Sequence, residues 1–314
     1  LYMVRSDENH TVAQTAAVTW KTLVSNTPKT LRELLPILMK RIVSNLSSKS
    51  EEKKVIAGRC MGDLVAKLGE KLMAELMPIL MNSLKSENAL MRHGVCVGMA
   101  ELLQAAPKQV IVDHCAAIVP AVQKAIVDSD DSVRKESARC VRLLYNAVGD
   151  RGLTEIVPWV LKKILASDPE DEQLEHLLDG LRQLLIIQSQ HVLPIVIGKL
   201  NKAPYTTTSI MGLSTIAAVT EANALHKNLT EVIPTCVSAV IQAKEQEDEA
   251  LKAAAHQCAK EVQLAVKNVG GVHLLLAELL SEFRDEDASR RAIAAEFAAT
   301  FFEETTIPLV SSLE

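Results

Sequence analysis

Aromatic residues are scarce in this sequence. Tryptophan, tyrosine and phenylalanine together make up 3% of the 314 residues, whereas hydrophobic residues of all kinds make up 48%. Sandwiches and barrels need large rings in their cores, so this imbalance favours helix pairs lined by leucine, alanine and valine. So few rings also cannot supply a regular stacking platform for single-stranded nucleic acid. An all-α protein is predicted.

The motifs of common enzyme and metal sites are also missing. No GxxxxGK[ST], GxGxxG or GxSxG occurs, the 8 histidines are scattered singly, and the 6 cysteines include no CxxC pair. We therefore predict no catalytic residues, no metal, no cofactor and no small-molecule substrate. Because a chain of this length does not need disulfides for stability, the dispersed cysteines indicate a reducing compartment, and a cytoplasmic location is predicted.

A long apolar span of membrane type is missing as well. The longest uncharged stretch, residues 203–220, contains Pro204 and several threonines, so no membrane contact is expected. The chain begins with Leu1, and its last stretch, "TTIPLVSSLE", ends within an apolar periodic run, so we expect a fragment of a larger protein. Residues 1–160 carry 21 Lys+Arg against 17 Asp+Glu, and the remainder carries 13 against 22. These net charges of +4 and −9 suggest different partners along the length.

A proline recurs near the start of successive apolar segments. The positions are Pro36, Pro78, Pro120, Pro158, Pro194, Pro234 and Pro308, separated by 42, 42, 38, 36, 40 and 74 residues. The last interval equals two periods and contains one repeat without its proline. Since proline is tolerated in a first helical turn, each proline is predicted to mark the start of a helix. A second periodic segment, such as Val133, Ser137, Cys140 and Leu144, lies between successive prolines.

Two helices in about 40 residues are typical of HEAT repeats, in which a helix pair buries its apolar face only against neighbouring pairs. We predict one HEAT-repeat array over residues 1–314, a right-handed α-solenoid of about eight two-helix repeats. The predicted pairs span 7–46, 51–85, 87–127, 130–166, 170–201, 204–243, 246–283 and, truncated, 285–314.

An aspartate and an arginine recur six residues apart at the start of the first helix. Asp128 and Arg134 show this spacing, as do Asp285 and Arg291, and Arg92 follows a serine in the same register. In HEAT turns such a pair ties one turn to the next, and the aspartate also accepts hydrogen bonds from N–H groups at the helix end. We therefore predict a structural ladder formed by Asp128, Arg134, Asp285 and Arg291, not a catalytic carboxylate cluster.

Six basic residues of the first helices form a candidate partner-binding basic face. They are Lys53, Lys54, Arg59, Lys135, Arg139 and Arg142. Helical rotation places the last three on one exposed face, and Arg59 occupies the position equivalent to Arg139 two repeats earlier. Two interpretations stay open. The face could contact phosphates or an acidic protein, or it could be a solvated surface that keeps the solenoid soluble.

Several longer phrases resemble a known family. "LYMVRSD…TW…LVSNTPKTLRELLP", "GRCMGDLVAKLGEKLMAELMPIL", "RHGVCVGMAELL" and "HVLPIVIGKL" are similar to the C-terminal HEAT array of the general control non-derepressible translational activators. The resemblance is strongest over residues 1–200 and weakens after Pro204. No contact residue of the family maps onto a position here.

The resemblance implies a function. In that family a very long HEAT protein binds stalled or collided ribosomes and recruits the initiation-factor-two-alpha kinase through the kinase's RWD domain, so that amino-acid starvation activates the kinase. By its order in the family, this chain would follow the segment similar to elongation factor three and precede or overlap the RWD-binding region. The expected partners are the ribosome, with its ribosomal RNA, and the kinase RWD domain. The alternative is a nuclear-transport or tubulin-binding HEAT module, which demands exposed tryptophans in successive repeats, whereas only Trp20 and Trp159 occur.

Overall fold

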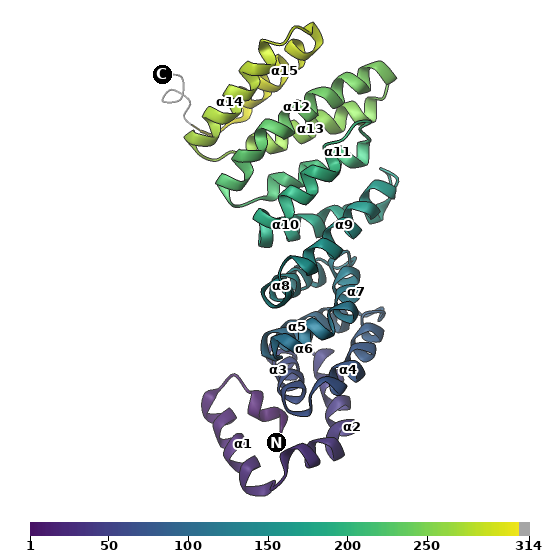
Figure 1. The fold of residues 1–314 in the computed structure, drawn as a ribbon, viewed down its shortest axis with the longest axis vertical. Helices are drawn as coiled ribbons and strands as arrows, with labels where there is room; N and C mark the ends of the chain where they lie inside the picture. The colour runs from purple at the N-terminus through teal and green to yellow at the C-terminus, as the bar shows by residue number, and fades with distance from the viewer. Residues whose placement is uncertain (308–314) are drawn as a thin grey trace. The chain divides into compact units, whose positions relative to one another are not determined.

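The computed structural model describes residues 1–307 and contains two compact units, Leu1–Ile156 (unit 1) and Val157–Glu314 (unit 2). All regular secondary structure in the described residues is helical (Figure 1). Among these residues no helix is both long enough and apolar enough to cross a bilayer.

Unit 1 consists of a short 3-10 helix followed by α-helices in first-and-second pairs. The 3-10 helix η1 spans Met3–Ser6, and the α-helices are α1 (His10–Leu23), α2 (Thr27–Leu46), α3 (Glu51–Leu68), α4 (Glu70–Ser83), α5 (Ala89–Ala105), α6 (Lys108–Asp113), α7 (Cys115–Ile126) and α8 (Asp131–Val148). In Figure 1 the first helices α3, α5 and α8 lie in one column, and the second helices α4 and α7 lie in the other. First helices therefore pack on first helices, as a repeat stack requires.

Helix α9 (Asp150–Ala166) spans the boundary between the units, and the remaining helices belong to unit 2. These are α10 (Glu172–Leu200), α11 (Thr207–Ser214), the 3-10 helix η2 (Thr215–Ala218), α12 (Ala222–Gln246), α13 (Glu249–Leu264), α14 (Val269–Phe283) and α15 (Ala288–Glu304). Helix α13 packs against α11 and α15, and α12 packs against α10 and α14. Helix α10 combines a first and a second helix, because non-helical backbone at Gln188 divides it.

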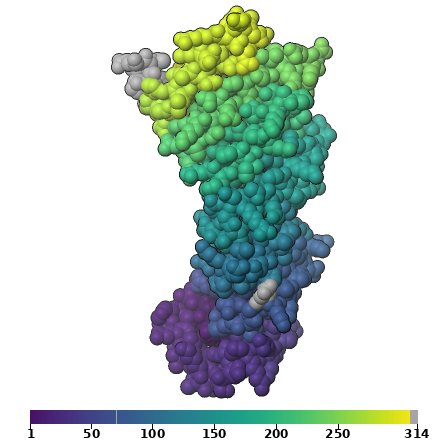
Figure 2. Space-filling view, in the orientation of Figure 1, coloured from purple at the N-terminus to yellow at the C-terminus, as the bar shows by residue number. Residues whose placement is uncertain are grey.

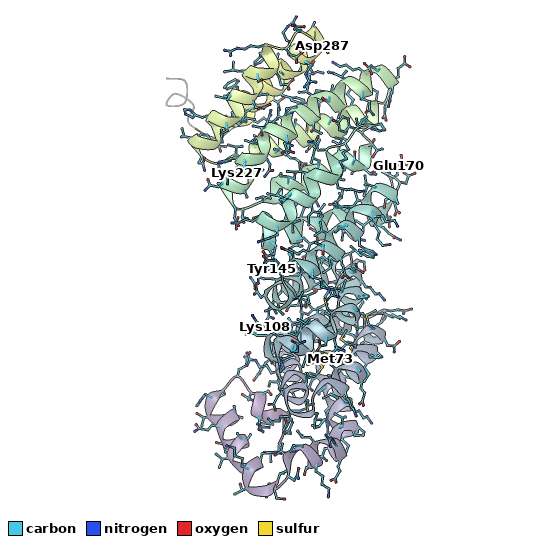
Figure 3. The ribbon with its side chains drawn as sticks, in the orientation of Figure 1. Met73, Lys108, Tyr145, Glu170, Lys227 and Asp287 are labelled. Atoms are coloured by element: carbon cyan, nitrogen blue, oxygen red, sulfur yellow. The ribbon has the colours of Figure 1, made fainter. Side chains whose placement is uncertain are left out.

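The first helices begin at His10, Glu51, Ala89, Asp131, Glu172, Thr207, Glu249 and Ala288. Each start lies within three residues of the position expected from the sequence. In each case the preceding residue caps the helix: its side-chain oxygen accepts a backbone N–H of the first turn. Figure 3 labels Asp287, which caps α15 by accepting the N–H of Ser289 at 2.8 Å. Helix starts were predictable because the capping chemistry is local.

The prediction that the periodic prolines mark helix starts is wrong. Pro36, Pro78, Pro120, Pro158, Pro194 and Pro234 lie inside their helices, while Pro308 falls outside the described residues. The first five of these six are on the exposed side. A proline inside a helix leaves one carbonyl without its N–H partner, and on the exposed side water can satisfy that carbonyl.

The core of unit 1 depends on an unusually close approach of helices. A Cβ added to Gly94 of α5 would lie 1.7 Å from the carbonyl oxygen of Leu46, and one added to Gly62 of α3 would lie 2.4 Å from the Cβ of Ala105. These distances are shorter than any non-bonded contact, so only glycine fits at both positions. Helix α5 therefore approaches the backbone at the end of α2 directly, and it packs closely on α3 of the preceding repeat.

Candidate interaction surface

The centre of the predicted basic face is a shared carboxylate. Glu101 of α5 accepts a hydrogen bond from Arg59 of α3 at 3.2 Å and another from Arg139 of α8 at 2.7 Å, and its side chain is only 8% exposed. Arg139 also donates to Glu136 at 2.8 Å. Burial alone would lower the pKa of Arg139, but these hydrogen bonds outweigh it and raise the pKa. The carboxylate thus neutralises two arginines and links three successive repeats.

Lys54 does not belong to an exposed face. Its side chain is 1% exposed, and its ammonium contacts Oε1 of Glu51 at 2.7 Å and Nδ1 of His93 at 2.9 Å. The sequence placed Lys54 in a polar first turn. The structure buries it between α3 and α5, where its ammonium reaches His93 of α5. We therefore remove Lys54 from the candidate partner-binding residues.

The other members of the basic face remain at the surface. Lys135 is exposed and pairs with Asp131 at 2.7 Å, one helical turn earlier. Lys53 and Arg142 are exposed, and neither forms an ion pair within residues 1–307. Of the six predicted residues, these two have charge that no carboxylate within the described residues offsets.

The ladder contact between turns is made by Arg92. Its guanidinium donates to both carboxylate oxygens of Asp128 at 2.8 Å and to the carbonyl oxygens of Ser86 and Glu87 at 2.9 and 3.0 Å. The side chains of Arg92 and Asp128 are 12% and 8% exposed. The hydrogen bonding of Arg92 to the Asp128 carboxylate is the main reason that the pKa of Arg92 is raised. Arg92 therefore stabilises its own turn through two carbonyl oxygens and binds the next turn through the carboxylate of Asp128.

Arg134 and Arg291 contact the carbonyl oxygens of their own turns in the same way. Arg134 donates to the carbonyl oxygens of Asp128 and Ser129 at 2.7 and 3.1 Å, and Arg291 donates to those of Asp285 and Glu286, both at 2.8 Å. The aspartate preceding each arginine by six residues thus contributes its carbonyl oxygen to this bond. Its carboxylate accepts the N–H two residues on, at 2.9 Å in both turns.

Sequence analysis did not identify two of these residues as contacts. Glu101 follows Arg59 by 42 residues and precedes Arg139 by 38, so it lies one repeat length from each. Arg92 lies 36 residues before Asp128. A search for opposite charges one repeat apart would have found all three pairs.

The cysteines offer no reactive thiol. All six are free and buried. Burial, followed by the charge of Asp63, raises the pKa of the Cys60 thiol to about 12, and burial also raises the pKa of Cys140. A thiolate nucleophile needs a lowered pKa and access to solvent, which these positions do not offer. Within residues 1–307 no three His, Cys, Asp or Glu side chains are grouped to hold a metal ion.

The tryptophans do not form a repeated exposed set. Trp20 is 6% exposed, and its indole N–H donates to the hydroxyl of Thr27 at 3.0 Å. Trp159 is partly exposed, with the ammonium of Lys163 5.0 Å from its ring centre. The feature that nuclear-transport or tubulin-binding arrays demand is therefore lacking at Trp20.

Paired helices, a repeat of about 40 residues and arginine contacts between successive turns define this chain as a HEAT-repeat protein. A family model described as "Stalled ribosome sensor GCN1-like, HEAT repeats" matches residues 192–313. The chain belongs to this GCN1 family. The match lies in the part of the sequence where the resemblance was weakest, so the relationship extends beyond residue 200.

Curated relatives carry the same name. Human stalled ribosome sensor GCN1 is 35% identical over 295 residues, which are 94% of this chain and 11% of the human protein. The eIF-2-alpha kinase activator GCN1 of Saccharomyces cerevisiae is 31% identical over 308 residues, 98% of this chain and 11% of the yeast protein. That of Dictyostelium discoideum is 37% identical over 237 residues, 76% of this chain and 9% of that protein. The chain spans about a tenth of the length of these relatives.

Among solved structures, yeast importin-beta (Kap95p) is similar over 99% of this chain and 40% of its own, with a TM-score of 0.43 and 14% sequence identity. Similarity at this level carries no conclusion about function.

Proposed function

We propose that this chain is a non-catalytic scaffold segment of a cytoplasmic translational-control protein, one that binds ribosomes and helps to activate the initiation-factor-two-alpha kinase during amino-acid starvation. The observation that supports this most directly is the 35% identity to human stalled ribosome sensor GCN1 along 94% of the chain. The names of the yeast and Dictyostelium relatives add kinase activation.

The mechanism we propose is the presentation of surface. Residues 1–314 act as one array of repeats and use no cofactor and no small-molecule substrate. Lys53, Arg59, Lys135, Arg139 and Arg142 face ribosomal RNA or an acidic protein, and the acidic second half faces protein partners such as the kinase RWD domain. Because Glu101 neutralises Arg59 and Arg139, most of the phosphate contact on this face falls to Lys53 and Arg142.

The test is a parallel pull-down of the 314-residue chain with purified ribosomes and with the RWD domain of the kinase. Capture of either partner supports a scaffold role for this segment and tells which partner it serves. If the chain captures neither, while the longer protein captures both, this segment is not the contact.

A second experiment addresses the basic face within the longer protein. Lys53→Glu with Arg142→Glu should weaken ribosome co-sedimentation and should make the remaining co-sedimentation less dependent on salt. The matched control is Lys199→Glu with Lys202→Glu, which changes the charge equally at two exposed positions of unit 2. Equal effects of the two pairs would mean that net charge, not this face, governs co-sedimentation.

A further inference from the structure

The exposed side of helix α2 carries unpaired positive charge. Lys29, Arg32, Lys40 and Arg41 are all exposed. Within residues 1–307 none of these side chains forms an ion pair or a hydrogen bond. Glu33 is the single acidic residue of this helix. In contrast to the arginines held by Glu101, these cations keep their full charge for a partner.

An apolar groove runs beside these charges. It lies between the second helices α2 and α4 and has a volume of about 160 Å³. Its apolar lining residues are Leu35, Pro36, Met39, Leu72, Leu76 and Ile79, with one carboxylate, that of Glu75, at its edge. Ile37, which follows the groove's proline, is 63% exposed. Pockets for whole small molecules start at about 300 Å³, so this groove fits an apolar side chain better than a complete ligand.

The groove forms where a proline lies inside a helix. Pro36 and Pro78 occupy equivalent interior positions of α2 and α4, and each is followed by an exposed isoleucine, Ile37 or Ile79. A side chain fixed in a ring cannot reach across to the neighbouring helix, and so it leaves the space between the two helices unfilled. The surface of α1 and α2 forms the purple end of unit 1 in Figure 2.

The chemistry of this surface selects one kind of occupant. Four unpaired cations attract carboxylates or phosphates equally well, but the groove beside them is aliphatic. Proteins that bind single-stranded RNA combine positive charge with aromatic side chains on which the bases stack, and no aromatic residue lines this groove. An amphipathic peptide, by contrast, uses both parts, because its apolar side chains fill a groove while its acidic side chains meet the charges at the rim.

We propose that the α2–α4 face, meaning the four cations of α2 and the apolar groove beside them, docks an acidic amphipathic peptide of a partner protein. An apolar side chain of the peptide enters the groove, and its glutamates or aspartates pair with Lys29, Arg32, Lys40 and Arg41. This inference does not rest on ribosome binding or kinase activation.

The test uses the 314-residue chain and a fluorescein-labelled 18-residue peptide that has leucines on one helical face and glutamates on the other. Fluorescence anisotropy at 0.15 M salt measures its affinity. The variants are Lys29→Glu/Arg32→Glu/Lys40→Glu/Arg41→Glu and, separately, Ile79→Ser, which changes an exposed residue of the groove lining. The matched control changes to glutamate four exposed lysines of unit 2 that form no ion pair in the described part of the chain, Lys199, Lys202, Lys244 and Lys267.

The peptide should bind the unmodified chain. The α2 charge variant should weaken binding by about tenfold or more, Ile79→Ser should weaken it by about three- to tenfold, and the unit 2 control should leave it nearly unchanged. Failure of the peptide to bind, or an equal loss in the control, overturns the proposal.

Other occupants give distinct results. If a 12-nucleotide single-stranded RNA binds with an affinity that depends on the α2 charges, while Ile79→Ser does not alter binding of the peptide, the face is a phosphate site and the proposal is overturned. If light scattering shows that the chain self-associates and that the α2 charge variant is monomeric, the occupant is a second copy, and the proposal is overturned as well.

Discussion

Replacing Arg92 with alanine should destabilise unit 1 more than any surface substitution in the same turn. The change removes two charge-assisted bonds to Asp128 and two bonds to backbone carbonyl oxygens. It leaves a carboxylate that is 8% exposed with the N–H of Asp130, at 2.9 Å, as a remaining partner. Removing one member of a buried ion pair costs about 3–5 kcal/mol, and an exposed pair contributes about 0–1 kcal/mol. Since both side chains are nearly buried but lie at a turn, we expect a loss of about 2–4 kcal/mol in the free energy of unfolding.

The two tryptophans provide the assay. Trp20 belongs to unit 1 and Trp159 to unit 2, so urea unfolding followed by fluorescence in a Trp159→Phe background reports on unit 1 alone. The control is Lys85→Ala, an exposed lysine that forms no ion pair with any described residue, for which we expect less than about 0.5 kcal/mol. Arg92→Lys keeps the charge but loses the two-oxygen contact, and so it should recover only part of the loss.

A double-mutant cycle separates the ion pair from the carbonyl contacts. Combining Arg92→Ala with Asp128→Ala should give a coupling energy of about 1–3 kcal/mol between the two side chains. If Arg92→Ala shifts the urea midpoint no more than Lys85→Ala does, the guanidinium does not hold successive turns together.

The structure supports four further predictions. Arg134→Ala should cost about 1–3 kcal/mol by denaturant unfolding, since its guanidinium is bound to two carbonyl oxygens; a shift below 0.5 kcal/mol, roughly that of a surface control, would refute this. Gly94→Ala should cost more than about 3 kcal/mol, because the new Cβ would lie 1.7 Å from a backbone carbonyl oxygen. The comparison variant Gly198→Ala, which meets nothing within 4 Å, should be neutral or stabilising by up to about 1 kcal/mol. The Cys60 thiol, with its pKa raised to about 12, should react with Ellman's reagent at pH 8 only as fast as unit 1 opens, and rapid labelling of the native chain would contradict its burial. Burial lowers the pKa of His226 below 6.5, so the unfolded chain binds the proton more tightly than the folded chain does. The free energy of unfolding therefore decreases as pH falls below 6.5. Urea titrations at pH 7 and pH 5 should show a smaller decrease for His226→Gln than for the unmodified chain.

Helix pairing was predictable from the sequence because its causes are local or periodic. The residues before α5, α8 and α15 identify helix starts, because their side chains accept backbone N–H groups of the first turn. The spacing of apolar residues identifies the buried side of each helix. The prediction that prolines mark helix starts failed because a proline in a first turn and an exposed proline inside a helix both occur within apolar helical patterns. Only the packing of α2 against its neighbours tells which side Pro36 occupies.

The charged residues were harder to predict, because a charge acts through partners that the helical pattern does not show. Rotation about the helix axis correctly places Arg142 at the surface. It cannot show that Arg139 meets a carboxylate from the preceding repeat, or that Lys54 is covered by α5. Those outcomes depend on how closely the repeats approach, and glycines such as Gly62 and Gly94 control that approach.

The two sides of unit 1 use charge for different purposes. On the first helices, Arg59 and Arg139 share Glu101 and Arg92 grips Asp128, so these charges link successive repeats. On the second helix α2, four cations have no carboxylate partner within residues 1–307, and Lys29 and Arg32, one helical turn apart, repel each other, which opposes folding. A partner that brings carboxylates relieves this repulsion. Part of the free energy of binding then comes from neutralising the α2 cations. In such a repeat protein, the unpaired charges on the second helices therefore indicate a binding surface better than the total charge of any helix.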